Sequence, residues 1–165
     1  MKKLIKKIIA PVKRFSGYQI ITARYGEPRK NGTHKGVDLR TRRFTPGIGF
    51  VKQWALQNIV APEKMLIKRF GTDGKGNDYI VCQPLEHLEY FELKFIHITV
   101  KDNWKYEWVI IEKGEVLGKS QLKGSSRAHH LHFEVLIDER SWTNPIVYLT
   151  TIGSRYKFKN KMKKG

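Results

Sequence analysis

Three of the chain's six histidines lie within four positions of one stretch, AHHLHFEVLI, at residues 128–137. Polar and apolar residues alternate after His129, which predicts a strand with one buried face. Side chains of a strand point alternately to opposite faces, so His130, His132 and Glu134 share one face and the apolar residues between them face a core. Two imidazoles on one face can converge on a single point, as metal binding or acid–base catalysis requires. A solvated polar face would give the same alternation, so this pattern leaves both interpretations open.

A second polar cluster, GTHKGVDLR at residues 32–40, favours metal binding or catalysis over a merely solvated polar face. Gly36 disfavours a regular helix here, so we expect a loop that enters an extended segment, with His34 and Asp38 on one face. These two residues and one histidine of the later pair would form a set of two imidazoles and one carboxylate. Such a set leaves a position open for water on zinc, which is typical of catalytic sites. A structural zinc site would need a fourth protein ligand, usually cysteine, and calcium or magnesium would prefer oxygen ligands.

The elements that must position these residues read as short strands separated by turns, so we expect an all-β fold, mainly antiparallel. The expected strands are YQIITARYG (18–26), NDYIVCQPL (77–85), YFELKFIHITV (90–100), YEWVIIEKG (106–114), LHFEVLI (131–137) and IVYLTTI (146–152). Turn residues fill EPRKNGTHKG (27–36), TPGIG (45–49) and GTDGKGND (71–78). Helical spacing is found in FVKQWALQNIV (50–60) and PLEHLEYF (84–91).

Length and charge limit the class of protein. The 165 residues, 40% of them hydrophobic, fit one compact domain, and Cys82 alone excludes an internal disulfide. Lysine and arginine number 32 against 15 acidic residues, and the net charge of +17 predicts attraction to a polyanion such as nucleic acid, anionic lipid or an anionic wall polymer.

The two ends are more basic than the middle, which suggests a basic lead-in at 1–16, a domain at 17–152 and a basic, solvated tail at 153–165. No apolar run is long enough for a transmembrane segment. The first residues begin like a signal peptide, but Lys6 and Lys7 interrupt the apolar stretch, so we do not expect a cleavable signal. An amphipathic helix near residues 4–12 is an alternative for this segment.

These motifs resemble those of the lysostaphin/LytM-type zinc metalloendopeptidases, which cut peptide bonds in bacterial peptidoglycan. HKGVDL is similar to the first motif of that family, FIHI carries a histidine where the family has its mid-chain histidine, and HLHFEV is similar to the last motif. The resemblance implies that His34, Asp38 and His132 bind one Zn²⁺ and that His97 and His130 form the catalytic pair. It also implies a sheet of duplicated-hybrid-motif type with a catalytic groove.

Flanking residues extend the resemblance from Tyr18 to Leu149, although residues 44–82 depart from the family pattern, so peptide specificity is not implied. His87 and His129 are expected to have no catalytic role, and Glu134 is expected to be a polar neighbour that could orient a ligand.

The expected function is therefore zinc-dependent cleavage of cross-links or stem peptides at the bacterial cell wall, outside the cell or on a virion, by a protein that could be phage-encoded. Peptidoglycan peptides and anionic wall polymers are the expected partners, and nucleic acid is not. Two alternatives remain: a non-catalytic LytM-like regulator that binds the wall, and a basic nucleic-acid-binding protein. The complete ligand set argues against the first. The second has the charge and the mixed basic and aromatic residues of SRYKFK in its favour.

Overall fold

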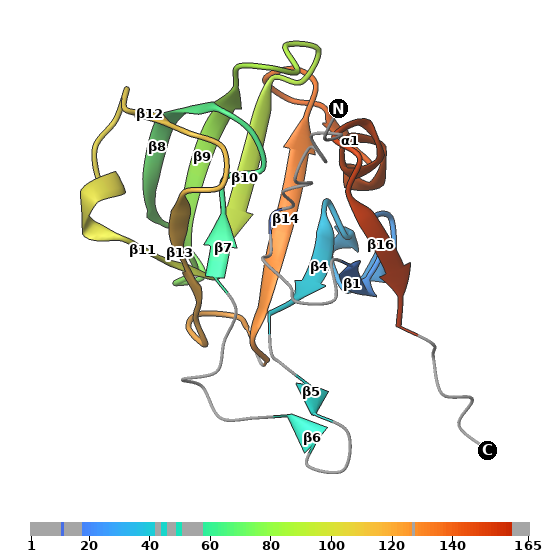
Figure 1. Cartoon of the computed structure of the whole chain (residues 1–165). Coiled ribbons are helices and arrows are strands. Elements are labelled where there is room, and N and C mark those ends of the chain that lie inside the picture. The colour runs from blue at the N-terminus through green and yellow to red at the C-terminus, as the bar shows by residue number, and fades with distance from the viewer. Residues whose placement is uncertain are drawn as a thin grey trace, which may run out of the picture.

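The computed structural model describes residues 18–41, 44–45, 49–50, 58–126 and 128–159, together with Pro11. About half of these residues lie in β-strands, and strands form most of the regular structure (Figure 1). The α-helix among them is α1, Pro145–Thr151, and a short 3-10 helix covers Asp102–Trp104. The expected all-β fold is confirmed.

Nine strands form the main sheet, and the neighbours along it are antiparallel except for β1 and β16, which are parallel. In spatial order they are β12 (Ile110–Ile111), β8 (Met65–Thr72), β9 (Asp78–Pro84), β10 (Glu92–Ile96), β14 (His130–Leu136), β4 (Val37–Arg40), β1 (Tyr18–Ala23) and β16 (Arg155–Phe158), with β15 (Trp142–Thr143) paired to β14. This order places the late motif on β14 directly beside the early motif on β4.

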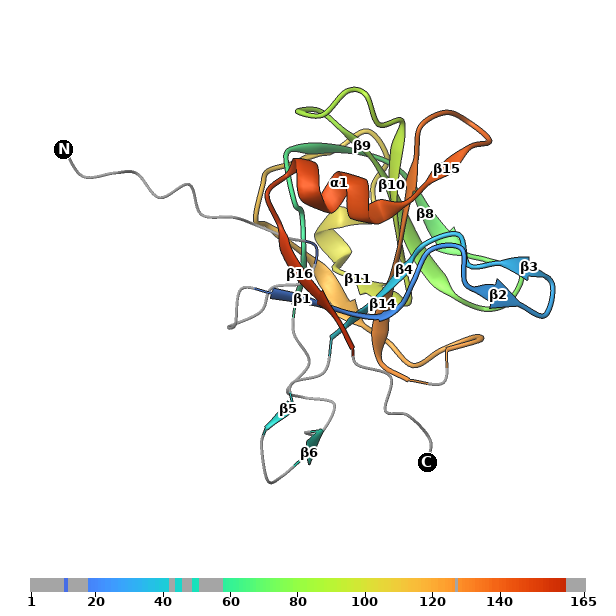
Figure 2. The ribbon, with the colours of Figure 1, turned by 90° about the vertical axis from the view of Figure 1, so that its right-hand side faces the viewer.

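Smaller sheets complete the described strands. A three-stranded sheet has the order β11 (Ile98–Val100), β13 (Val116–Ser120) and β7 (Asn58–Val60). Two short hairpins pair β2 (Pro28–Arg29) with β3 (Gly32–Thr33) and β5 (Phe44–Thr45) with β6 (Gly49–Phe50). The β2–β3 hairpin projects away from the main sheet (Figure 2).

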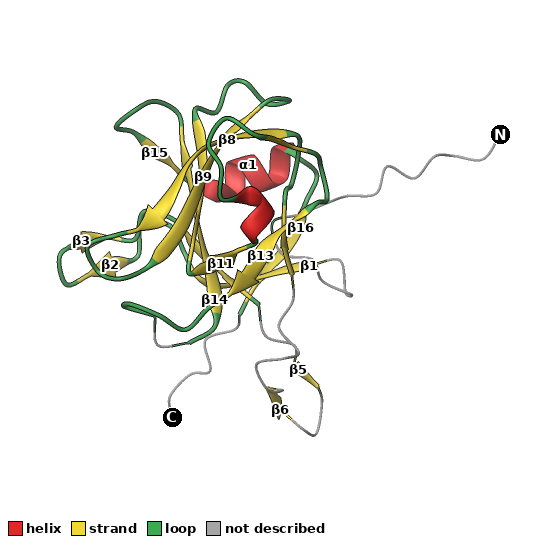
Figure 3. Cartoon of the chain, turned by 90° about the vertical axis from the view of Figure 1, so that its left-hand side faces the viewer, coloured by secondary structure: helices red, strands yellow, loops and turns green. Residues whose placement is uncertain are grey.

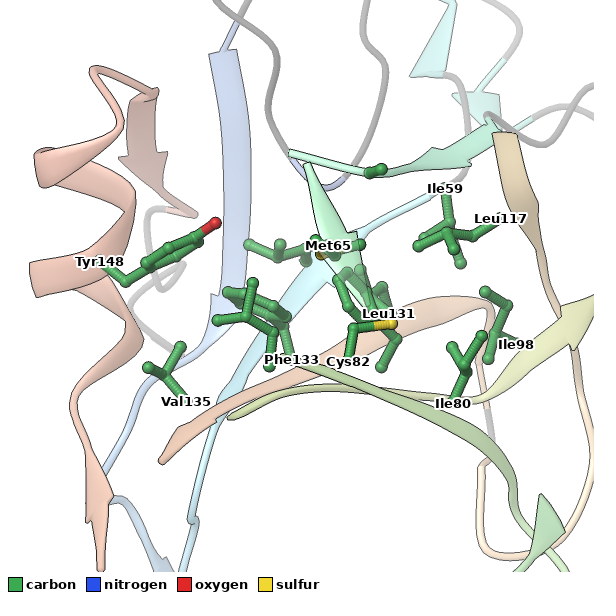
Figure 4. Close-up of a cluster of buried hydrophobic side chains, with 14 of the residues drawn as sticks. Ile59, Met65, Ile80, Cys82, Ile98, Leu117, Leu131, Phe133, Val135 and Tyr148 are labelled. Atoms are coloured by element: carbon green, nitrogen blue, oxygen red, sulfur yellow. The ribbon is translucent and has the colours of Figure 1, made fainter. Parts of the chain in front are cut away.

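The hydrophobic core lies where the two larger sheets and α1 meet. Figure 4 shows Ile59, Ile98 and Leu117 of the three-stranded sheet beside side chains of the main sheet, with Tyr148 of α1 at the opposite end. Tyr148 is fully buried, and its ring centroid lies 5.9 Å from that of Phe133. In the side view, α1 (red) lies against the strands of the main sheet (Figure 3).

The alternation predicted for β14 is confirmed. Leu131, Phe133 and Val135 are fully buried in the core, whereas His130 and His132 lie on the other face and are half-buried. Burying an aliphatic or aromatic side chain stabilises a fold by about 1.5–3 kcal/mol. The same residues that anchor β14 therefore fix which way its two histidines point.

The predicted strand at 146–152 is wrong, because this segment is the helix α1. The side chain of Asn144 accepts a hydrogen bond from the backbone N–H of Ile146, and Pro145 occupies the first turn. An asparagine N-cap followed by proline is a strong helix start, and it outweighs the β-branched residues that suggested a strand.

Both predicted helices are also wrong wherever the structure describes them. In the 84–91 segment, the buried carboxylate of Glu63 accepts hydrogen bonds from the backbone N–H groups of Glu86 and His87, and the chain forms a turn. Of the 50–60 segment, Phe50 belongs to β6 and Asn58–Val60 forms β7, while 51–57 lies outside the described residues. Strands β8 and β13 were not predicted.

The structure describes only parts of the two basic ends. The expected solvated tail begins with an edge strand, since Arg155–Phe158 pairs in parallel with β1. The possible amphipathic helix lies outside the described residues; Pro11 is buried, and its carbonyl accepts the N–H of Val60 at 3.0 Å. No helix among the described residues is long and apolar enough to cross a membrane. The domain boundaries at 16 and 152 stay a prediction.

Candidate active site

The structure brings His34, Asp38 and His132 together. Asp38 and His132 are directly paired in the register of β4 and β14, and His34 lies in the loop that leads from β3 into β4. Three atoms form a nearly equilateral triangle: His34 Nε2 and His132 Nδ1 are 3.0 Å apart, and Asp38 Oδ1 lies 3.2 Å and 3.0 Å from them. Two strands and one loop thus place three potential ligand atoms around one point.

The backbone carbonyl of Arg24, the residue that follows β1, orients the ring of His34. Its Nδ1 lies 2.7 Å from the carbonyl oxygen of Arg24. A carbonyl oxygen only accepts hydrogen bonds, so Nδ1 carries the proton and donates it. The neutral ring therefore presents the lone pair of Nε2 to Asp38 and His132, as a metal ligand must.

His132 is oriented through its other ring nitrogen, Nε2, so that Nδ1 faces the centre. The Nε2 atom lies 3.0 Å from Glu134 Oε1, while Glu134 Oε2 accepts a hydrogen bond of 2.8 Å from the indole N–H of Trp142. The ammonium of Lys35 lies 3.7 Å from the centroid of the Trp142 indole. Burial acts to raise the pKa of Glu134, but the hydrogen bond and charge of His132, together with the hydrogen bond from Trp142 and the charge of Lys94, outweigh burial and lower that pKa. An ionised Glu134 thus accepts the Nε2 proton and leaves Nδ1 of His132 facing the centre.

This donor set fits a zinc ion. Oriented in this way, the two imidazole lone pairs and the Asp38 carboxylate all point to one place, where only a cation or a shared proton can satisfy three acceptors. Ligand atoms on a tetrahedral zinc ion are about 3.3 Å apart for bond lengths near 2.0–2.1 Å. The 3.0–3.2 Å edges of the triangle are close to that separation.

Electrostatics keep the carboxylate charged. Burial acts to raise the pKa of Asp38, yet hydrogen bonds from His132 and His34 together hold it well below its usual range. For His132, burial acts to lower the pKa, but the hydrogen bonds to Asp38 and Glu134 raise it to about 9 when no metal is bound. The centre therefore concentrates negative charge at a place that a cation can reach.

His97 and His130 lie beside this triangle. Their ring centroids are 4.8 Å apart in an edge-to-face arrangement, and the His97 centroid is 6.3 Å from that of His132. His130 Nδ1 donates to the carbonyl of Ala128 at 2.7 Å, which leaves Nε2 as an acceptor 3.6 Å from Asp38 Oδ1. The predicted pair is thus adjacent to the predicted ligands and separate from the triangle.

His97 occupies a backbone conformation that is rare outside glycine, with φ of 63°. Its N–H donates to the carbonyl of Asp78 at 3.0 Å, and its own carbonyl accepts from the N–H of Gln121 at 2.9 Å. Burial, followed by the nearby charges of His130 and His132, lowers the pKa of His97 to about 4. Its Nδ1 is buried without a hydrogen-bond partner. Two strand ends thus hold a neutral imidazole at the centre's edge.

Gly36 lets β4 approach β14 closely enough to form the centre. A Cβ atom at this position would collide with the carbonyl oxygen of Phe133 and would lie 2.9 Å from His132 Nε2. A side chain here would therefore displace either the strand or the ligand ring.

The centre opens into a cleft of about 850 Å³. Its walls come from the β2–β3 hairpin, the β8–β9 turn and the loop before β14, while β10, β14 and β4 form its floor. The cleft is lined by Arg29, Lys30, Asn31, Thr33, His34, Lys35, Asp38, Asp73, Gly74, Lys75, Asn77, Lys94, Ile96, His97, Ser125, Ser126, His130, His132 and Glu134. The five predicted site residues all belong to this lining, and His87 and His129 do not.

Three supporting groups were not found from the sequence: the carbonyls of Arg24 and Ala128 and the indole of Trp142. Main-chain carbonyls leave no signal in residue type. Trp142 lies ten residues after His132, and the pairing of β15 with β14 brings it to Glu134.

Comparisons with known proteins give structural matches only. No family model matches the chain, and a search of curated proteins finds no significant match. The catalytic domain of the antimicrobial peptidase lysostaphin from Staphylococcus simulans has a TM-score of 0.57 at 20% identity, over 79% of this chain and 89% of that domain. The catalytic domain of the prophage-encoded M23 protein EnpA from Enterococcus faecalis has a TM-score of 0.57 at 16% identity, over 84% and 97%.

A zinc-containing peptidase from Vibrio cholerae matches with a TM-score of 0.52 at 17% identity, over 81% of this chain and 39% of that one. The match also covers about half, 55%, of a longer lysostaphin chain. The similarity thus extends over most of this chain and corresponds to the catalytic part of lysostaphin. The chain has the fold of the lysostaphin/LytM-type peptidases.

Proposed function

We propose that the protein is a zinc-dependent endopeptidase that cleaves cross-links or stem peptides of bacterial peptidoglycan. The observation that carries this proposal is the convergence of His34 Nε2, Asp38 Oδ1 and His132 Nδ1, with two further histidines beside them in an open cleft. A protein that only binds the wall would not need three potential metal ligands and two adjacent histidines. The set therefore supports an enzyme over a regulator that only binds the wall.

His34, Asp38 and His132 would hold one Zn²⁺ through these three atoms. When bound, zinc acts as a Lewis acid toward a peptide carbonyl and lowers the pKa of water toward about 7. The hydrogen bonds from the two rings to Arg24 and Glu134 would keep the ligands in place as substrate enters.

His130 is placed to move the proton. Its Nδ1–H is committed to the Ala128 carbonyl, so Nε2 has the free lone pair and lies near Asp38 at the open side of the centre. This nitrogen would take the proton from the attacking water and return it to the leaving amine.

His97 is placed to stabilise charge. With a pKa of about 4 it is neutral at pH 7, and a neutral imidazole can donate an N–H to the oxyanion that develops on the scissile carbonyl. The two backbone hydrogen bonds that fix its left-handed conformation hold the ring for this purpose. In this proposal His130 transfers the proton, and His97 stabilises the oxyanion as a fixed hydrogen-bond donor.

Peptidoglycan is supported as the substrate by the structures that share the fold, one of which is the antimicrobial peptidase lysostaphin. The net charge of +17 would draw the protein to anionic polymers of the wall. We place its action at the bacterial cell wall, outside the cell or on a virion, and a phage origin stays a prediction.

Digestion of purified bacterial walls tests the proposal. The wild-type protein should lower the turbidity of a wall suspension, a zinc chelator should stop this, and added zinc should restore it. A His130→Ala variant, with the same charge and its metal ligands intact, serves as the matched control and should be inactive. Wall digestion that proceeds equally with the chelator present, or with the control variant, contradicts the proposal.

A further inference from the structure

The cleft carries more positive charge than its own carboxylates can neutralise. Among the described residues, the basic side chains that line it belong to Arg29, Lys30, Lys35, Lys75 and Lys94. Three acidic residues, Asp38, Asp73 and Glu134, line it as well.

All three carboxylates are committed within the protein. Asp38 faces the two ligand histidines. Asp73 Oδ1 accepts the backbone N–H groups of Lys75 and Asn77, and its Oδ2 accepts the Asn77 side chain. Both oxygens of Glu134 accept hydrogen bonds, as described above. The negative charge in the cleft is thus used for structure and for the metal centre.

Lys94 is the basic residue that lies on the cleft floor next to that centre. In the register of β10 and β14, Lys94 is opposite Glu134 and Ile96 is opposite His132. Residues two apart on a strand share a face and are about 7 Å apart. Lys94 and Glu134 therefore form a row of side chains about 7 Å from the row that contains His132, on the same face of the sheet. A substrate peptide that crosses the centre from β14 towards the Lys94 side of the cleft would pass this row.

Lys94 is a half-buried residue, and its ammonium lies within ion-pair distance of no carboxylate that the structure describes, although its charge helps to lower the pKa of Asp73 and of Glu134 nearby. Its nearest aromatic contact is Tyr79, whose ring centroid lies 5.3 Å away. By contrast, Lys35 is seated on Trp142, Arg29 lies 3.8 Å from Asp38, and Lys30 and Lys75 are exposed at the rim. A partly shielded, unpaired cation in a substrate cleft is complementary to an anionic group of the ligand.

We propose that Lys94 binds a free carboxylate of the substrate peptide close to the bond that is cut. The protein therefore prefers peptidoglycan stem peptides that carry this carboxylate over amidated stem peptides and over bridges made of glycine alone. This inference rests on the proposed endopeptidase function and names the class of peptide that it cleaves. Lys94 determines specificity in this account and takes no part in the chemical step.

Three soluble probes test the inference with zinc-loaded, full-length protein. The first is a cross-linked stem-peptide dimer with free carboxylates, the second is the same dimer with those carboxylates converted to primary amides, and the third is pentaglycine. The wild type should cut the acidic dimer with a KM about tenfold lower than that for the amide, the usual worth of one charge-assisted hydrogen bond in a shielded site.

Substitution of Lys94 should remove that preference. Lys94→Gln should raise KM for the acidic dimer about tenfold with little change in kcat, because it removes binding that is equal in ground and transition states. KM for the amidated dimer should stay unchanged, and Lys94→Arg should restore most of the preference. Lys113→Gln is the matched control, since Lys113 is exposed in the turn before β13 and does not line the cleft.

The outcomes separate this inference from the proposed function. Equal cleavage of both dimers by the wild type, or faster cleavage of pentaglycine, contradicts the inference and leaves the endopeptidase proposal standing. Retention of the preference in Lys94→Gln with normal zinc content also contradicts it. Cleavage of none of the three probes, by protein that contains zinc, contradicts both. If poly(glycerol phosphate) inhibits the wild type and not Lys94→Gln while both dimers are cut equally, the ligand of Lys94 is a wall phosphate and the inference is wrong.

Discussion

At the scale of single residues, each of the two proposed ligand histidines is oriented by a hydrogen bond at the ring nitrogen that faces away from the centre. His34 uses Nδ1 on a backbone carbonyl, and His132 uses Nε2 on a carboxylate. The two rings therefore offer different nitrogens to the same point. Such outer hydrogen bonds fix the tautomer and the direction of a ligand, which is why residue types alone do not make a metal site.

The first prediction separates ligands from catalysts. His34→Ala, Asp38→Ala and His132→Ala should each lose zinc, because each removes one corner of the triangle. His97→Ala and His130→Ala should keep about one zinc per chain, as a three-ligand site requires, and lose turnover. Elemental analysis of the purified variants, together with a wall-digestion assay, makes the distinction.

Loss of zinc in His130→Ala with retention in His132→Ala would mean that the two histidines of β14 have exchanged roles. If the variant with all three ligand substitutions still contains about one zinc per chain, other residues bind the zinc.

The same residues show how far the sequence could be read. Residue type, spacing and strand parity predict that His34 and Asp38 meet one histidine of the later pair. The choice of His132, and the pairing of His97 with His130, come from the resemblance to the lysostaphin/LytM-type family, and these roles stay predictions. Trp142, which fixes Glu134, could not be predicted, because its role depends on the pairing of β15 with β14. Main-chain acceptors such as the Arg24 carbonyl could not be predicted from side-chain identity at all.

At the scale of elements, the centre depends on the close approach of β4 to β14. The register pairs Asp38 with His132, and Gly36 passes against the backbone of Phe133. The alternation in β14 was readable because its apolar side chains are fully buried. The helix α1 and the turn at 84–91 were misread because a cap at Asn144 and a tertiary contact from Glu63 decide them.

The second prediction concerns this approach. Gly36→Ala should destabilise the protein by about 1–3 kcal/mol, as overpacking in a filled site does, and should weaken zinc binding. Urea denaturation and a zinc-competition titration measure the two effects. Gly74→Ala is the control, because a Cβ at position 74 would meet nothing within 4 Å. Equal effects of the two substitutions would show that the contact does not constrain the centre.

The third prediction concerns the clasp between β9 and the loop before β14. Asp78 accepts hydrogen bonds from Lys123, Gln121 and Thr72. Burial acts to raise the pKa of Asp78, but these contacts, with Lys123 first, lower it from 3.8 to about 2. A carboxylate with a depressed pKa in the folded state contributes stability above its unfolded pKa, and that contribution is lost as the pH falls.

The metal-free wild type should therefore exceed Asp78→Asn in stability above pH 4, and the difference should shrink as the pH falls from about 4 to 2. Urea denaturation of both forms across this range provides the measurement. A difference that stays constant from pH 5 to pH 2 would show that the charge of Asp78 does not hold the loop.

At the scale of the whole molecule, the net charge of +17 and the cleft have separate tasks in the proposed function. The charge would act over a Debye length of about 8–10 Å and raise the local concentration of the protein at an anionic wall. The cleft would recognise the peptide. The C-terminal segment belongs partly to the fold, since β16 pairs with β1, while most side chains of this strand stay exposed to solvent.

The fourth prediction follows from that division. Removal of residues 160–165, which include three lysines and leave β16 intact, should lower activity on whole walls at low salt. Cleavage of a soluble peptide should stay unchanged, and high salt should abolish the difference on walls because it screens the charge. Removal of residues 155–165 should in addition lower the melting temperature, because it deletes β16. A loss of soluble-peptide cleavage in the shorter truncation would place residues 160–165 in the fold or the cleft.

The central claim is that the protein breaks peptide bonds of peptidoglycan, and the new chain ends in digested walls test it most directly. After digestion with zinc-loaded protein, purified walls should release new free amino groups, which labelling and mass spectrometry can assign to one peptide bond. Reducing sugar ends should not increase, and walls treated with His130→Ala should show neither change. New reducing ends without new amino groups would contradict the account.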